Sequence, residues 1–140
     1  MRRAMGGAVL VDAGFLVALL SSRDGHHEWA AEQSARLPLP WRTCDAVVSE
    51  TFHLLGPVGV PALVGLLRRG AVVLSFELGT ELERVLALME KYSNVPMSLA
   101  DACLVRMTET LADPVVATTD SDFKIYRRHS RQAIAIVSPG

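Results

Sequence analysis

A short, continuous apolar run near the N-terminus reads Ala8-Val9-Leu10-Val11 and ends in an acid, Asp12. Apolar runs of this length, without alternation, are typical of parallel strands that are buried on both faces. The pattern recurs at residues 71–74 and again at residues 115–118, where the acids Asp120 and Asp122 follow. The sequence therefore predicts buried parallel strands, two of which deliver acids at their carboxyl ends.

Helical patterns separate these strands. We predict helices at about residues 14–20, 27–36, 45–55, 61–69, 82–89 and 98–111, a short helix at residues 124–128, and further strands at residues 41–43 and 133–137. Alternating strands and helices imply a central parallel sheet with right-handed crossovers and helices on both faces. The expected fold class is therefore α/β, a three-layer α/β/α arrangement that forms a single domain over residues 1–140.

Composition narrows the function classes. The chain has 140 residues, half of them hydrophobic, which suits one compact domain with a buried core. A formal net charge of −1 argues against proteins that coat nucleic acid non-specifically, so any RNA contact must use a local basic patch.

Asp12 interrupts the apolar N-terminal region, which argues against a signal peptide or a membrane span, and we expect a cytoplasmic protein. Cys44 and Cys103 are expected to be reduced structural thiols.

Four acids that are distant in the sequence are expected to meet. Asp12 and Asp120 follow strands, and open parallel sheets bind ligands beyond the carboxyl ends of their strands. Glu50 and Asp101 lie near the starts of helices that could border the same crevice. Clustered carboxylates repel one another unless protons or a cation offset the charge, and ligands that are all oxygen favour Mg²⁺ or Mn²⁺. The joint pattern therefore favours a divalent metal site.

Each acid also has a purely structural explanation. Asp12 could cap the helix that follows it, and Asp120 could cap the short helix after the third buried strand. Ser98 with Asp101 resembles a capping box, and Glu50 could be an ordinary exposed helix residue. Taken singly, these explanations are at least as good as a metal site, so only the joint pattern favours function.

Four stretches resemble one known family when they are read in order. They are Val9-Leu10-Val11-Asp12-Ala13-Gly14, Ser49-Glu50-Thr51-Phe52-His53-Leu54-Leu55, Leu99-Ala100-Asp101-Ala102 and Thr118-Thr119-Asp120-Ser121-Asp122-Phe123. Each stretch is short, but the ordered set resembles the PIN domain, specifically the VapC-like toxins of bacterial toxin–antitoxin pairs. Asn94, which lies before the third stretch, is a departure: the resemblance leads us to expect an acid at this position. The difference leaves the four acids unchanged and bears on how the substrate approaches.

The resemblance implies a set of site residues and an activity. It matches the acidic quartet of the family to Asp12, Glu50, Asp101 and Asp120, with Asp122 as an auxiliary metal ligand and Thr118 as a hydrogen-bonding neighbour. The implied activity is that of an endoribonuclease that depends on Mg²⁺ or Mn²⁺ and acts on tRNA, rRNA or mRNA. A cognate antitoxin and a second copy of the chain are the implied protein partners.

The implied chemistry needs no histidine, because metal ions held by carboxylates can activate a water and neutralise the leaving oxygen. Products with 5′-phosphate and 3′-hydroxyl ends are expected, since water rather than the ribose 2′-hydroxyl attacks. One basic concentration lies directly after the last acids, at Lys124, Arg127, Arg128, His129 and Arg131. These side chains could hold RNA phosphates beside the metal, or they could be a solvated helix face.

Other functions remain open at this point. The chain could be an RNA-processing PIN nuclease without an antitoxin, or a non-catalytic module that binds RNA or protein. A receiver-like signalling domain would also place acids at strand ends, but the phosphate-pairing lysine that it needs at a late strand end is missing. A metal-independent ribonuclease would have to use His53 or His129, and EDTA would leave it active.

Overall fold

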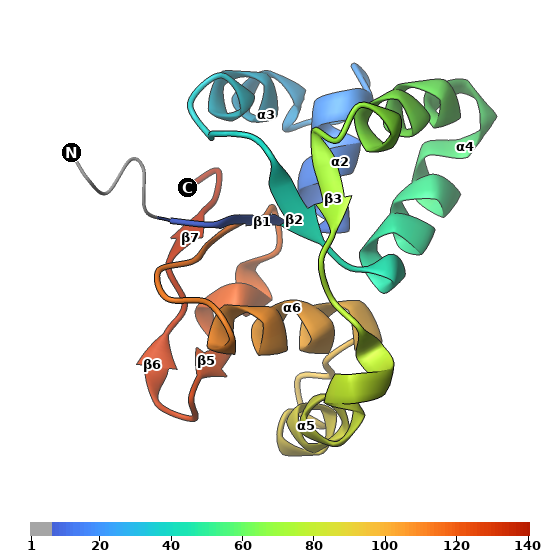
Figure 1. The fold of residues 1–140 in the computed structure, drawn as a ribbon. Coiled ribbons are helices and arrows are strands. Elements are labelled where there is room, and N and C mark those ends of the chain that lie inside the picture. The colour runs from blue at the N-terminus through green and yellow to red at the C-terminus, as the bar shows by residue number, and fades with distance from the viewer. Residues whose placement is uncertain (1–6) are drawn as a thin grey trace.

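The computed structural model describes residues 7–140 and is built around a five-stranded sheet with the strand order β3-β2-β1-β4-β7 (Figure 1). The strands are β1 Val9–Val11, β2 Trp41–Thr43, β3 Val72–Leu74, β4 Val115–Ala117 and β7 Ile136–Val137. Every neighbouring pair in this sheet is parallel. The predicted α/β fold class is therefore confirmed.

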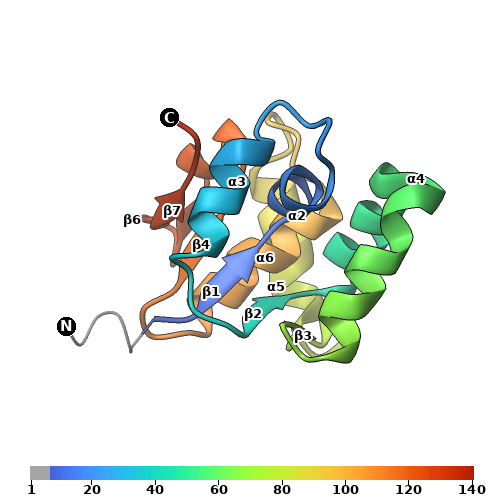
Figure 2. The same cartoon turned by 90° about the horizontal axis from the view of Figure 1, so that it is seen from above.

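Helices cover both faces of the sheet. They are α2 Ala13–Leu20, α3 His27–Ser34, α4 Asp45–Arg68, α5 Leu78–Lys91, α6 Leu99–Glu109 and the 3₁₀ helix η1 Ser121–Lys124. Helices α2 and α3 lie on one side of the strands, α5 and α6 lie on the other, and α4 runs beside α2 (Figures 1 and 2). The sheet is thus enclosed between two helical layers, as the alternating pattern predicts.

Burial of the central strand explains its apolar sequence. Val9, Leu10 and Val11 are almost completely buried, because helices cover both faces of β1. The register pairs Val11 with Ala117 of β4, and the backbone N–H of Asp12 donates to the Ala117 carbonyl at 3.3 Å. The acid that follows β1 therefore lies beside the residues that follow β4, which is the first step in building the site.

Helix α4 is interrupted, as the Gly56-Pro57 pair predicts. Gly56 has φ 69° and ψ −176°, a non-helical conformation that glycine tolerates and that kinks the helix. The second half then begins at Pro57 rather than at residue 61. By length and composition alone α4 could cross a membrane. Each half, however, is shorter than the roughly 20 residues that a spanning helix needs, and Val47 and Leu66 lie in the protein core.

The C-terminal segment differs from the sequence-based prediction. The expected helix at residues 124–128 is wrong, because η1 ends at Lys124 and Arg127–Arg128 forms strand β5. The expected strand at residues 133–137 is divided: β6, Gln132–Ala133, pairs antiparallel with β5, and only β7 joins the main sheet. The turn between β5 and β6 uses positive φ angles at His129 and Ser130, and neither residue is the glycine that usually signals such a turn.

The two cysteines are free and buried, as predicted, but they are not separate. Cys44 directly precedes α4, Cys103 lies in α6, and their thiols are hydrogen-bond partners. This contact joins the starts of the two helices that carry Glu50 and Asp101.

Candidate active site

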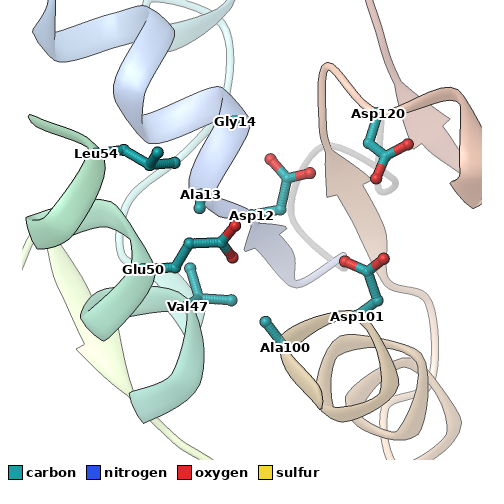
Figure 3. Close-up of a pocket in the computed structure, with 9 residues that line it drawn as sticks. All are labelled: Asp12, Ala13, Gly14, Val47, Glu50, Leu54, Ala100, Asp101 and Asp120. Carbon is teal, nitrogen blue, oxygen red and sulfur yellow. The ribbon is translucent and has the colours of Figure 1, made fainter. Parts of the chain in front are cut away.

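A pocket of about 180 Å³ opens at the carboxyl edge of the sheet, where four acidic side chains face it (Figure 3). They are Asp12, Glu50, Asp101 and Asp120. Each comes from a different part of the fold: the end of β1, the second turn of α4, the first turn of α6 and the loop after β4. The structure therefore brings together the four acids that the sequence pattern singled out.

Asp12 is held by hydrogen bonds on both oxygens. Its Oδ1 accepts from the backbone N–H of Phe15 at 2.8 Å, which caps α2, and its Oδ2 accepts from the hydroxyl of Thr118. The Thr118 hydroxyl in turn accepts from the backbone N–H of Asp120 at 2.8 Å. The cap explanation of Asp12 is correct, and the same carboxylate lines the pocket, so the two explanations do not compete. Thr118 is the hydrogen-bonding neighbour that the resemblance implied.

Asp101 lies in the first turn of α6, where another residue caps the helix. The Ser98 hydroxyl accepts from the backbone N–H of Asp101 at 3.0 Å and caps the helix. The Asp101 carboxylate instead accepts from the hydroxyl of Tyr126, which lies 2.9 Å from Oδ2. The predicted capping box is thus formed on the Ser98 side, and the acid is turned toward the pocket.

Burial and mutual repulsion disfavour negative charge on two acids of this pocket. Burial raises the pKa of Asp12 to about 6, against the hydrogen bonds from Thr118 and Phe15. Burial also raises the pKa of Asp101 to about 6, against the hydrogen bond from Tyr126. Neighbouring carboxylates add to both shifts. No Lys, Arg or His is among the described residues that line the pocket.

Gly14 allows the first turn of α2 to approach the loop after β4. A Cβ at this position would overlap the hydroxyl of Thr119 and would lie 3.6 Å from Oδ1 of Asp12. The absence of a side chain therefore lets α2 pack closely against Thr119, the residue before Asp120. Gly14 belongs to the first of the four motif stretches, but this role could not be predicted, because a glycine in a helix gives no signal of what lies beside it.

Several predicted residues lie outside this pocket. Asp122 belongs to η1 and donates its backbone N–H to Oδ1 of Asp120, but it is not among the lining residues. His53 is exposed on α4, and His129 lies in the β5–β6 turn, so neither histidine lines the acidic pocket. A metal-independent mechanism centred on these histidines thus gains no support from their positions.

The two central arginines of the predicted basic patch are engaged elsewhere. The guanidinium of Arg128 donates to the backbone carbonyls of Thr108 and Leu111, at the end of α6. The guanidinium of Arg127 donates to the carbonyls of Lys124, Ile125 and Tyr126. Neither side chain is among the residues that line the acidic pocket, so contact of this pair with RNA phosphates beside the metal stays a prediction that these positions do not favour.

The donor set suits a divalent metal ion, although the structure shows no closed coordination shell. All four acids offer hard carboxylate oxygens, which are the ligands that Mg²⁺ and Mn²⁺ prefer. Within residues 7–140, no three His, Cys, Asp or Glu side chains are grouped closely enough to hold one ion. The four carboxylates nevertheless line one pocket, and a cation would compensate the charge of Asp12 and Asp101, whose ionisation burial disfavours.

The sequence model of the PIN domain matches residues 9–128 of this chain. The chain belongs to the PIN domain family. PIN domains are generally nucleases that use divalent metals such as Mg²⁺ and act on RNA. The matched region of this PIN domain contains all four pocket acids and ends within β5. A search of the curated proteins returned no match to the chain.

Proposed function

We propose that this PIN domain is a metal-dependent endoribonuclease and that Asp12, Glu50, Asp101 and Asp120 hold its divalent cation. One observation carries the proposal: four carboxylates from four separate elements line one pocket in which no described cationic side chain offsets their charge. Such a pocket costs folding free energy, because burial and repulsion oppose ionisation. A bound cation would offset this loss of folding free energy. A purely structural role would not explain why the acids are placed together.

The bound cation would lower the pKa of a water molecule and neutralise charge on the leaving oxygen. The protein's own contribution is to hold the carboxylates. Thr118 fixes the Asp12 carboxylate and the backbone before Asp120 at the same time, so the ends of β1 and β4 act as one rigid support. Glu50 is exposed and has the freest side chain of the four, which suits it to meet water or substrate at the rim.

Lys124 is the basic side chain that remains available for RNA beside this edge of the sheet. It is exposed at the end of η1, four residues after Asp120, and it lines a second pocket with Thr119 and Ser121. Within residues 7–140 the Lys124 ammonium group forms no ion pair. We therefore expect Lys124, rather than Arg127 or Arg128, to make the phosphate contact nearest to the acidic pocket.

Cleavage of a labelled RNA tests the proposed activity. The purified protein is expected to cut RNA in Mn²⁺ or Mg²⁺, to stop in EDTA, and to leave 5′-phosphate and 3′-hydroxyl ends. Asp122→Asn is a useful comparison, because Asp122 neighbours the pocket without lining it, and we expect a weaker loss than from Asp120→Asn. Undiminished cleavage in EDTA would rule out the metal mechanism.

We further propose that the protein is the toxin of a toxin–antitoxin pair, acting in the cytoplasm as a homodimer that a cognate antitoxin inhibits. The support is the resemblance of the four ordered motifs to VapC-like toxins. Induced expression in bacteria should arrest growth with the wild type and not with Asp101→Asn, and a small antitoxin gene should lie next to this one. A solitary gene without growth arrest would favour an RNA-processing nuclease, and a monomer in light scattering would refute the dimer.

A further inference from the structure

Tyr126 is completely buried, and its hydroxyl contacts the carboxylate of Asp101, one of the four acids that line the pocket. It donates to Oδ2 of Asp101 at 2.9 Å. Among the described residues, the Asp101 carboxylate has two side-chain donors, the hydroxyls of Tyr126 and Ser98, and both are neutral. The buried Tyr126 hydroxyl therefore holds Oδ2 of Asp101, and Figure 3 shows the Asp101 and Asp120 carboxylates pointing toward one another.

Two other aromatic rings fix the position of the Tyr126 ring. Phe123 contacts it edge-on, with ring centroids 5.2 Å apart, and Tyr92 contacts it with centroids 5.1 Å apart. Phe123 lies in η1, three residues after Asp120, whereas Tyr92 ends α5. We call Tyr92, Phe123 and Tyr126 the aromatic triad. It connects the loop that carries Asp120 to the helix that carries Asp101.

The chemistry of the donor matters as much as its position. A tyrosine hydroxyl orients a carboxylate without cancelling its charge, whereas an arginine or lysine would orient it and neutralise it. Groups that hold metal-ligating side chains from behind commonly change metal affinity by about 10- to 100-fold when they are removed. The geometry at Asp101 corresponds to such an arrangement.

We propose that Tyr126 is a positioning residue that fixes the Asp101 carboxylate for a divalent cation, and that the aromatic triad transmits the position of the Asp120 loop to Asp101. This inference rests on the proposed function, because it assumes that the pocket binds a cation. It adds Tyr126, which is not one of the four acids, to the residues of the proposed metal site. The segment after β4 would then both carry Asp120 and help to position Asp101.

Two tyrosine-to-phenylalanine variants provide a matched test. Tyr126→Phe removes the hydroxyl that contacts Asp101 and keeps the ring contacts. Tyr92→Phe removes a hydroxyl from the same triad, but that hydroxyl accepts from the backbone N–H of Arg127 and does not touch an acid. Mn²⁺ affinity is measured by titration calorimetry of the metal-free proteins, and melting temperatures without metal report the structural effect of each change.

Tyr126→Phe is expected to weaken Mn²⁺ binding about 10-fold. The Mn²⁺ affinity of Tyr92→Phe should stay within about twofold of wild type, even if both variants lower the melting temperature equally. If the two variants bind Mn²⁺ equally well, or lose affinity equally, Tyr126 has only a structural role. Should Tyr126→Phe fold poorly, Phe123→Leu keeps the hydroxyl and loosens the ring contact, and unchanged Mn²⁺ affinity in that variant would overturn the role of the triad.

The design separates this inference from the proposed function. If the wild type binds Mn²⁺ but cuts no RNA, the proposed activity fails while the Tyr126 comparison is still decided by calorimetry. If the wild type cuts RNA and Tyr126→Phe binds Mn²⁺ like the wild type, the positioning role alone is refuted. A wild type that binds no Mn²⁺ would refute both.

Discussion

The two ends of helix α6 carry acids in opposite surroundings. At the C-terminal end, Glu109 is paired with the guanidinium of Arg106 at 3.1 Å and accepts from the backbone N–H of His129 at 2.8 Å. At the N-terminal end, Asp101 faces other acids and is held by a neutral hydroxyl, with no ion pair among the described residues. One helix thus contains an acid that stabilises the fold, Glu109, and an acid whose ionised form destabilises the metal-free fold, Asp101.

This contrast separates structural charge from functional charge. Arg106 also binds Glu81 at 2.6 Å, so the paired end of α6 joins two helices. The unpaired end gains nothing comparable in the metal-free protein, since burial and neighbouring carboxylates disfavour its ionisation. Acids with a raised pKa cluster at functional sites, and a bound cation would stabilise their ionised form most strongly there.

The largest effect is expected when the two acids of α6 are neutralised in turn. Asp101→Asn should lower RNA cleavage by about 100-fold or more, equivalent to about 2.7 kcal/mol of activation free energy, because it removes a charge proposed to hold the metal. Glu109→Gln should keep cleavage near wild type and lose about 1 kcal/mol of unfolding free energy with its ion pair. Equal cleavage by the two variants would erase the distinction between the ends.

A large stability effect is expected at Arg128. Replacement by Ala leaves the Thr108 and Leu111 carbonyls without a charged donor, and the free energy of unfolding should fall by about 3 kcal/mol, since each such bond contributes roughly 1.5–3 kcal/mol. Urea unfolding measures the loss. The folded fraction should bind RNA with the salt dependence of the wild type, and a flatter dependence would return Arg128 to the RNA-contact role that its position argues against.

The pH dependence of stability tests the unpaired end from another direction. The pKa of Asp12 is about 6 in the folded protein against 3.8 when unperturbed, so the folded state holds a proton that the unfolded state has lost. Metal-free stability should therefore fall as pH rises from about 4 to about 6 and then level off, by up to about 3 kcal/mol for Asp12.

Asp12→Asn should remove much of this slope and be more stable than wild type at pH 7.5, with the advantage lost near pH 4. The Asn side chain can still cap α2, so the comparison isolates charge. Thermal melting in a chelator across this range measures both proteins. A wild type whose metal-free stability rises with pH through this window would contradict the raised pKa of Asp12 on which this prediction rests.

The smallest effect concerns RNA affinity at Lys124. Lys124→Ala should lower the salt dependence of RNA binding by roughly 0.7–0.9 in the log–log slope, as expected for one lost phosphate contact. Arg131→Ala is the control, because Arg131 is exposed in the β5–β6 turn near the opposite end of α6. If Arg131→Ala changes the slope and Lys124→Ala does not, RNA crosses the paired end of α6 instead.

The sequence predicts well what depends on short-range pattern. Apolar runs that end in acids identified β1 and β4, and the cap residues Asp12 and Ser98 were found because capping is a local matter. The four acids were placed together because parallel strands share a carboxyl edge. The family match confirms the PIN domain that the motifs indicated.

The contacts that complete the site lie beyond such patterns. Tyr126 meets Asp101 across 25 residues, and no local spacing distinguishes it from any core tyrosine. The turn at His129 and Ser130 lacks a glycine, and Arg128 is bound by carbonyls of the C-terminal part of α6, so the segment resembled a basic helix in sequence and is a hairpin in space. Tertiary contacts decided these features.

Calorimetric titration of the metal-free protein with Mn²⁺ tests the central claim most directly. The account predicts saturable binding by the wild type, binding at least about 10-fold weaker in Asp12→Asn and Asp101→Asn, and wild-type binding in Glu109→Gln. Wild-type affinity in both aspartate variants, or no Mn²⁺ binding by the wild type, would contradict the conclusion that the four pocket acids form the metal site.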